Sequence, residues 1–170
     1  TAEGAYNKIQ HDQGLRRFTE ERKTYNPILT NKAASYYQIN GNFGMVEFHS
    51  KANALDADSM QLLGDALQHA EENYIGLIIH NDASHFSCGV NLEAIGGFIE
   101  SQDWVGLDNF LDHFQKTVKA MKYSKIPVIS APSGLSIGGG FEVVLSTDMT
   151  IYHANSVTGL VESLVGVVPG

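Results

Sequence analysis

The stretch GLSIGGGFE at residues 134–142 carries the strongest structural signal in the sequence. It follows the apolar run PVISA at 127–131, which is typical of a buried strand, and its glycine run leads directly into Phe141 and Glu142. Glycines permit a tight turn from strand to helix, and the first N–H groups of a helix have no partner within the helix. The stretch therefore predicts a strand, a turn and a short helix from about Phe141, with N–H donors available to the oxygen of a ligand.

Glu142 has a counterpart in Glu162, which lies within the stretch TGLVESLVG at 158–166. Apolar residues flank both glutamates, so we expect both side chains to be at least partly buried. Two carboxylates on glycine-rich backbone can hold one water and move its protons, provided that a nearby group binds the oxygen of the substrate. The pattern predicts acid–base chemistry beside an oxyanion hole. In the alternative, the glycines form only a tight junction and Glu162 is a surface residue of a loop.

The segment GLSIG at 134–138 also matches Gly-x-Ser-x-Gly, the nucleophile elbow of serine acyl hydrolases. Under this alternative Ser136 is the nucleophile, and His153 with either Asp148 or Glu142 would complete the triad. Asp148 and His153 both lie within 17 residues of Ser136, which leaves little chain for separate triad loops. A serine hydrolase is therefore the weaker hypothesis.

The sequence lacks the patterns of several other sites. It contains neither Gly-x-Gly-x-x-Gly nor Gly-Lys-Ser/Thr, so neither dinucleotide binding nor a P-loop is indicated. The seven histidines form no His-x-x-x-His pair, and the single cysteine, Cys88, has no cysteine partner. No metal site is predicted.

The composition is typical of one globular domain. The chain has 170 residues, of which 43% are apolar and 18% charged. A single cysteine excludes an internal disulfide, which fits a reducing compartment and predicts a cytoplasmic location. No apolar run approaches the roughly 20 residues of a membrane span. The net charge is −8; residues 1–25 hold five Lys or Arg against four acids, which is +1 and leaves −9 elsewhere. This negative charge would repel the phosphate backbone of a nucleic acid, so nucleic-acid binding is not expected.

Strand and helix patterns alternate along the chain, which indicates an α/β fold with parallel strands. Residues 1–28 are expected to form a polar tail or interdomain linker, with a short strand near 17–19, and residues 29–170 form the domain. Strands are expected at 35–39 and 44–48, joined as a hairpin, and at 75–79, 126–130 and 149–153. Residues 81–91 are expected to form a loop. Helices are expected after Asp56 and from Trp104, with Trp104 in the core.

Five ordered segments resemble the crotonase (enoyl-CoA hydratase/isomerase) superfamily, from about Ile28 to Gly170. They are SKANAL at 50–55, FSCGVNL at 86–92, PVISA through GGGFE at 127–142 with Asp148, GLVE at 159–162 and GVVPG at 166–170. Their matching order and spacing make the resemblance specific. Asn91 stands where the family has Asp and Val90 where it has Ala, and the first segment is one residue short and lacks its Pro.

The resemblance implies a ββα spiral fold and a set of site residues. The N–H groups of Val90 and Gly139 would form the oxyanion hole, which holds the thioester carbonyl of an acyl-CoA. Glu142 would be the base on water and Glu162 the proton donor. The substrate-binding residues implied by the same motifs are Lys51, Ala52, Ser87, Cys88, Gly89, Asn91, Leu92 and Gly138.

The implied activity is hydration of 2-enoyl-CoA to 3-hydroxyacyl-CoA in fatty-acid β-oxidation. An enoyl-CoA isomerase that uses mainly Glu162 is the alternative within the superfamily. No cofactor is implied in this domain, because CoA is part of the substrate. The polar tail and the residues around His49 and Glu162 resemble those of hydratase domains that are fused to a 3-hydroxyacyl-CoA dehydrogenase. In such a protein NAD would be the cofactor of the dehydrogenase domain. A trimer-type homo-oligomer is implied for the full-length protein.

The sequence stops at Pro169-Gly170, whereas the family continues for roughly another hundred, mostly helical residues. It also starts at Thr1 without a Met, so we expect a domain cut at both ends, truncated before its C-terminal helical part. An inactive fragment is therefore a further hypothesis beside the hydratase, the isomerase and the hydrolase.

Overall fold

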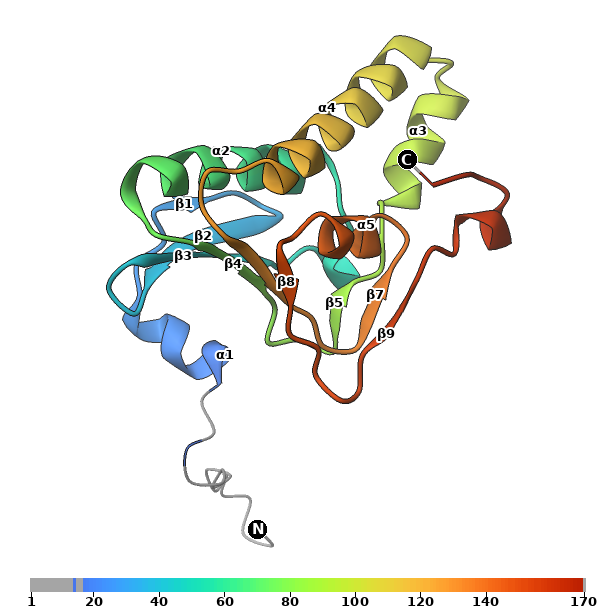
Figure 1. Cartoon of the computed structure of the whole chain (residues 1–170). Helices are drawn as coiled ribbons and strands as arrows, with labels where there is room; N and C mark the ends of the chain where they lie inside the picture. The colour runs from blue at the N-terminus through green and yellow to red at the C-terminus, as the bar shows by residue number, and fades with distance from the viewer. Residues whose placement is uncertain (1–13, 15–16, 170) are drawn as a thin grey trace, which may run out of the picture.

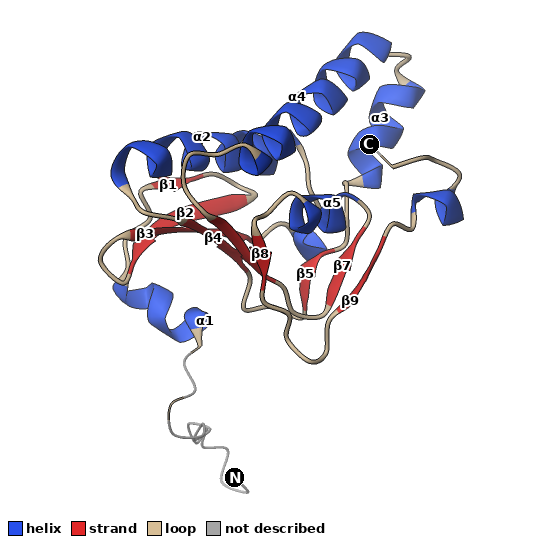
Figure 2. Cartoon of the chain, in the orientation of Figure 1, coloured by secondary structure: helices blue, strands red, loops and turns tan. Residues whose placement is uncertain are grey.

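The computed structural model describes Gly14 and residues 17–169, which form two β-sheets with helices packed on them (Figures 1 and 2). The strands are β1 (Leu29–Thr30), β2 (Ala34–Ile39), β3 (Phe43–Phe48), β4 (Leu77–His80), β5 (His85–Ser87), β6 (Val128–Ala131), β7 (Leu135–Ile137), β8 (Met149–Thr150) and β9 (Val157–Gly159). The α-helices are α1 (Phe18–Glu21), α2 (Ala57–Asn73), α3 (Leu92–Glu100), α4 (Trp104–Lys122) and α5 (Gly139–Leu145). Short 3₁₀ turns lie at Arg22–Thr24, Lys51–Asn53 and Glu162–Val165.

The larger sheet has the strand order β1-β2-β3-β4-β6-β8. Its first three strands are antiparallel, and β3, β4, β6 and β8 are parallel. The predicted hairpin at 35–48 is confirmed: Asn40 and Gly41, which lie between β2 and β3, both have positive φ, as a tight hairpin turn requires.

Helix α2 packs on one face of this sheet, against β1, β2 and β3, and α4 packs against α2 (Figure 2). The predicted helix after Asp56 is confirmed, because Asp56 and Ser59 form a reciprocal capping box at the start of α2. The apolar side of α2 is buried in the main core, and α4 adds Phe110, Phe114 and Met121. The prediction for Trp104 was wrong: its side chain is 58% exposed. It lies in the first turn of α4, at the end that projects away from the sheet together with α3 (Figure 1).

The smaller sheet has the order β5-β7-β9 and is entirely parallel. All three of its strands lie where no strand was expected, including β9, which follows the predicted strand at 149–153. The predicted loop at 81–91 contains β5, and the glycine-rich stretch contains β7 at Leu135–Ile137. Each has three residues, which is too short for the period-2 pattern of a strand to be visible. This sheet brings three of the segments that resemble the family side by side, namely those at 86–92, 127–142 and 159–162.

The predicted strand near residues 17–19 was wrong, because α1 begins at Phe18. The Phe18 ring packs edge-on against Tyr37 at a centroid distance of 5.3 Å. Helix α1 lies on the side of the sheet opposite α2 (Figure 1). Arg22 Nη1 contacts the buried Glu47 carboxylate at 2.9 Å. These contacts attach residues 18–22 to the sheet. Residues 1–13 and 15–16 of the predicted tail lie outside the described residues.

Asp82 forms a second attachment for α1, and its titration makes this attachment pH-dependent. Its Oδ2 accepts from the N–H and the Oγ1 hydroxyl of Thr19, at 3.1 and 2.7 Å. Burial alone would raise the pKa of Asp82, but these bonds and the charge of Arg17 outweigh it and hold the pKa below its usual value. A carboxyl whose pKa is depressed by folding stabilises the fold fully at pH values above its unfolded pKa of about 3.9. This stabilisation is lost as the pH falls through the lower, folded pKa.

We therefore expect Asp82→Asn to lower the free energy of unfolding at neutral pH and to lose this effect in acid. The reason is that wild-type Asp82 itself becomes protonated as the pH falls through its folded pKa, which lies below the usual value. Urea titrations at pH 7 and at a pH below that folded pKa measure the difference. Asp108→Asn, on the exposed face of α4, is the matched control and should change little at either pH. An equal destabilisation by Asp82→Asn at both pH values would contradict the assigned linkage.

Gly44 in β3 is required by the close approach of Tyr36. A Cβ at position 44 would lie 2.6 Å from Tyr36 Cε2, and the Tyr36 ring is fully buried with its hydroxyl 3.3 Å from His69 Nδ1. We expect Gly44→Ala to destabilise the fold by about 1–3 kcal/mol through overpacking. Gly96→Ala on α3 meets no atom within 4 Å and should be neutral or stabilising by up to about 1 kcal/mol. Equal urea midpoints for the two variants would contradict the prediction.

Within the described part of the chain, the helices are all too short or too polar to cross a membrane.

Candidate active site

Two glycine-containing turns meet at the end of the smaller sheet. One is the 88–91 loop, which connects β5 to α3; the other is the 138–140 turn, where β7 passes into α5. Gly89 has φ +90°, and a Cβ on it would lie 3.0 Å from Ile137 O and 3.5 Å from Gly139 N. A Cβ on Gly139 would lie 2.9 Å from Val90 Cγ2. The two turns are therefore in direct contact, and glycine is what permits this approach.

The backbone of the 88–91 loop is held on one side by the segment before α2. Leu55 N–H donates to Gly89 O at 2.8 Å, and Asn91 N–H donates to Leu55 O at 2.7 Å. Because backbone groups alternate along an extended segment, the N–H of Val90, between them, points away from Leu55. Among residues 17–169, neither Val90 N–H nor Gly139 N–H donates to a protein acceptor. The site thus has two adjacent backbone donors available to a ligand.

The carboxylate of Glu162 lies against the 138–140 turn. A Cβ on Gly138 would lie 3.1 Å from Glu162 Oε1. Both carboxylate oxygens are buried, and neither has a hydrogen-bond partner within the described chain. The position follows from β9, which pairs with β7, and from the bond of Gly138 N–H to Gly159 O at 2.9 Å. A buried, unpartnered carboxylate beside unpartnered N–H donors is typical of a binding site rather than of a packed core.

Glu142 lies at the start of α5, where its N–H donates to Gly138 O. Helical side chains tilt towards the N-terminus and cover the preceding turn, so we expect the Glu142 side chain to lie over the 138–140 turn. The predicted helix near Phe141 is confirmed, beginning at Gly139. Both glutamates are therefore placed around the first turn of α5, although they come from different segments.

The remaining implied site residues surround the 88–91 loop in different ways. The Asn91 side chain caps α3 by accepting from the N–H groups of Glu93 and Ala94, and Leu92 is exposed at the first position of that helix. Lys51 and Ala52 are exposed on the neighbouring segment. Each of these four residues is accessible at the edge of the site.

Ser87 and Cys88 are more enclosed. Ser87 is fully buried, and its Oγ accepts from Gly89 N–H at 3.1 Å. Its side chain therefore supports the loop rather than facing a ligand, and it packs so closely on Gly140 that a Cβ there would lie 2.6 Å from Ser87 Cβ. Cys88 is half-buried, and burial raises the pKa of its thiol. A raised pKa disfavours the thiolate and so a nucleophilic role.

The serine hydrolase hypothesis is contradicted by the position of Ser136. This residue lies within β7, between β5 and β9, and is fully buried. Its Oγ has no hydrogen-bond partner in the described chain, whereas a nucleophile elbow exposes the serine at a strand-to-helix turn beside a histidine. His153 instead contacts Asn155 Oδ1 at 2.6 Å on the surface.

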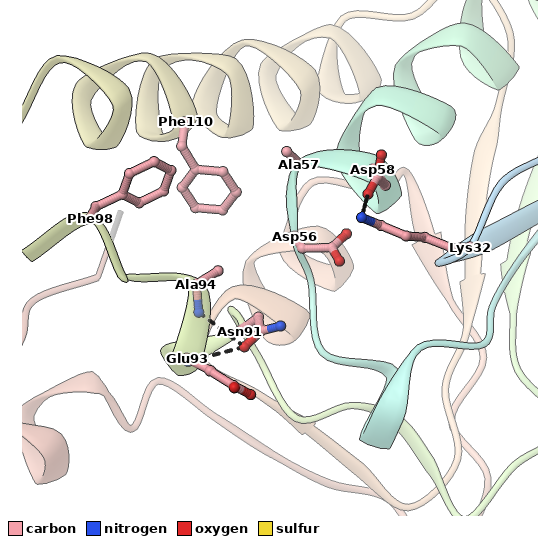
Figure 3. Close-up of a pocket in the computed structure, with 9 residues that line it drawn as sticks. All are labelled: Lys32, Asp56, Ala57, Asp58, Asn91, Glu93, Ala94, Phe98 and Phe110. Atoms are coloured by element: carbon pink, nitrogen blue, oxygen red, sulfur yellow. Dashed lines mark hydrogen bonds and ion pairs between the residues drawn. The ribbon is translucent and has the colours of Figure 1, made fainter. Parts of the chain in front are cut away.

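A cavity of about 380 Å³ opens beside the site, between the starts of α2 and α3 (Figure 3). Phe98 and Phe110 form its apolar wall, and the Lys32–Asp58 ion pair lies at the opposite end. Asn91 is the one implied site residue that lines it. Neither glutamate lines this cavity, so it adjoins the turns that carry the unpartnered donors rather than containing them. In the described chain no group of three or more His, Cys, Asp or Glu side chains is arranged to hold a metal.

Two sheets, a helix that begins at a glycine turn and adjacent unpartnered N–H groups characterise this end of the molecule. The chain belongs to the enoyl-CoA hydratase/isomerase family, whose sequence model matches residues 38–170. The predicted superfamily and fold class are thereby confirmed.

Curated relatives and solved structures agree with this assignment. A Bacillus subtilis protein named "Probable 3-hydroxyacyl-CoA dehydrogenase" is 33% identical over 98% of this chain and 21% of its own length. A Rickettsia felis protein named "Putative fatty acid oxidation complex trifunctional enzyme" is 32% identical over 84% of this chain and 20% of its own length. The chain thus spans about a fifth of these relatives.

The fold is that of solved enoyl-CoA hydratases. The enzyme from Polaromonas sp. JS666 superposes with a TM-score of 0.76 at 22% identity, over 81% of this chain and 55% of that one. The enzyme from Bacillus anthracis gives 0.73 at 23% identity, over 82% and 54%. The chain spans about half the length of these structures.

Proposed function

We propose that the protein hydrates 2-enoyl-CoA thioesters to 3-hydroxyacyl-CoA in fatty-acid β-oxidation. The observation that carries the proposal is the contact between the 88–91 loop and the 138–140 turn, with Val90 and Gly139 N–H unpartnered and the Glu162 carboxylate beside them. Donors next to a carboxylate suit a reaction in which an oxyanion develops while a proton moves.

In the proposed mechanism, the thioester carbonyl oxygen accepts from the N–H groups of Val90 and Gly139. Glu142 removes a proton from water as the water oxygen bonds to C3. The electron pair of the C2–C3 double bond moves towards the carbonyl, and C2 takes a proton from Glu162. The two N–H donors stabilise the enolate-like charge, which is absent from the ground state, and therefore accelerate the reaction.

Isomerisation of 3-enoyl-CoA to 2-enoyl-CoA is the second candidate. It is favoured by the placement of Glu162, whose carboxylate alone could move a proton from C2 to C4 beside the same oxyanion hole. Both reactions use an acyl-CoA thioester, and neither requires a cofactor in this domain. The names of the relatives support a further proposal, that the hydratase domain is part of a larger protein with an NAD-dependent 3-hydroxyacyl-CoA dehydrogenase. We also propose a trimer-type assembly and a cytoplasmic location.

The test is to incubate the full-length protein separately with crotonyl-CoA and with 3-enoyl-CoA. Gain of water is detected by mass spectrometry, and double-bond migration by the ultraviolet absorbance of the conjugated 2-enoyl thioester. Addition of water to crotonyl-CoA supports the hydratase. Conversion of 3-enoyl-CoA to 2-enoyl-CoA without gain of water supports the isomerase. If neither substrate changes in the folded protein, both proposals fail and the inactive alternative is retained.

A further inference from the structure

Strand β5 carries the 88–91 loop, yet β5 has only three residues. It pairs with β7 on one side, and the register shifts between His85 and Ser87. A short, irregular pairing of this kind fixes the following loop weakly. The Leu55 bonds to Gly89 O and Asn91 N–H orient Val90 within the loop, so other contacts must hold the strand if the loop as a whole is to keep its place.

Two buried carboxamides supply such contacts. Asn53 Nδ2 donates to His85 O at 2.8 Å, and Asn81 Nδ2 donates to Phe86 O. Asn81 is fully buried, and its Oδ1 accepts from Phe48 N–H at 2.7 Å, so it also ties β5 to the end of β3. Successive carbonyls of β5 are thus held by side chains from two different segments.

Asn53 is held in a backbone conformation that is unfavourable for most residues. Its φ is 51°, and that of Ala52 is 56°; a left-handed conformation costs a non-glycine residue roughly 1–2 kcal/mol. The surrounding contacts must offset this strain, and Asn tolerates the region better than most residues. In this conformation Ala52 O accepts from Cys88 N–H at 3.2 Å. The strained pair therefore contacts both the start of β5 and the first residue of the loop.

We propose that Asn53 and Asn81 are positioning residues that fix β5 and thereby aim Val90 N–H into the oxyanion hole. Neither side chain touches the reacting atoms; each acts through the carbonyl that it holds. The catalytic consequence rests on the proposed function, whereas the effect on the loop does not. Cys88, the only cysteine of the chain, lies within the loop and can report its mobility independently of activity.

The test uses the full-length protein with two variants and one control. Asn53→Gly keeps the left-handed backbone available and removes the side chain with its carboxamide. Asn81→Asp keeps the acceptor for Phe48 N–H and removes the donor to Phe86 O. Asn31→Asp is the control, because Asn31 Nδ2 likewise donates to a backbone carbonyl, that of Asp58, but has no contact with β5. The measurements are kcat and KM for crotonyl-CoA, the rate of Cys88 alkylation by peptide mass spectrometry, and the unfolding midpoint.

Both variants should lower kcat at least about tenfold through misplacement of the donor, with KM within about threefold of wild type. Cys88 alkylation should accelerate about fivefold or more, as local opening increases. The control should change neither rate. Folded Asn53→Gly with kcat and alkylation both within about twofold of wild type overturns the proposal, as does a lower unfolding midpoint with unchanged alkylation. If Asn81→Asp does not fold, Asn53→Gly decides. If the wild type does not hydrate crotonyl-CoA, the proposed function fails, and alkylation alone decides the positioning role.

Discussion

Gly139→Pro is expected to abolish hydration of crotonyl-CoA while the protein remains folded. The substitution deletes one of the two N–H donors proposed to bind the thioester oxygen. Loss of one such donor typically lowers kcat about 10²- to 10³-fold. The position is otherwise suited to proline, because Gly139 is the first residue of α5, where proline is well tolerated. Gly138 before it has φ 53° and ψ −133°, outside the α region that a following proline disfavours.

The proline ring also adds a Cβ, which would lie 2.9 Å from Val90 Cγ2 and 3.1 Å from Phe114 Cζ. Gly139→Ala is therefore the matched control, since it adds the same Cβ and keeps the N–H. Val90→Ala should be nearly silent alone, because Val90 contributes a backbone group, and it relieves the contact. Both substitutions at 139 should be compared in the Val90→Ala background by kcat and circular dichroism. Hydration retained by the folded proline variant would overturn the oxyanion assignment.

The elements that the sequence predicted correctly are those with long or repeated signals. Helix α2 has a full amphipathic period and an Asp56 cap, and the β2–β3 hairpin has alternating strands around Asn40-Gly41. Both signals are local, so they are visible without knowledge of the rest of the fold. Trp104 was misplaced for the complementary reason. The period of α4 marks its apolar side, but not how far along the helix the main core extends to cover it.

The arrangement of the site depends on non-local contacts that no periodicity reveals. Gly89 and Gly138 meet because β5 pairs with β7, and both strands are too short to be predicted. The resemblance to a family, rather than the spacing of residues, is what suggested that these segments converge. Asn53 and Asn81 were missed for a related reason. Asparagine usually marks a turn, and the burial of these two carboxamides follows only from the tertiary structure.

Glu142→Gln and Glu162→Gln are each expected to lower kcat for hydration by about two or more orders of magnitude, with little change in substrate binding. A positioned acid or base typically contributes about 10²- to 10⁴-fold, and glutamine keeps the shape of the side chain while it can neither remove nor deliver the proton. At Glu162 the fold should tolerate the change, because a neutral amide replaces a buried carboxylate that has no hydrogen-bond partner in the described chain. Glu72→Gln, on the exposed side of α2, is the control and should leave kcat unchanged.

The same two variants separate the hydratase from the isomerase. If the protein mainly isomerises 3-enoyl-CoA, Glu162→Gln should remove double-bond migration, whereas Glu142→Gln should leave it largely intact, because only one carboxylate is needed to move a proton between C2 and C4. Hydration requires both groups, since one must activate water while the other protonates C2. Measuring both reactions for each variant gives a two-by-two result. Full hydration by either folded variant would contradict the two-glutamate mechanism. In that mechanism Glu142 and Glu162, both placed at the first turn of α5, are each required, one to activate water and the other to protonate C2.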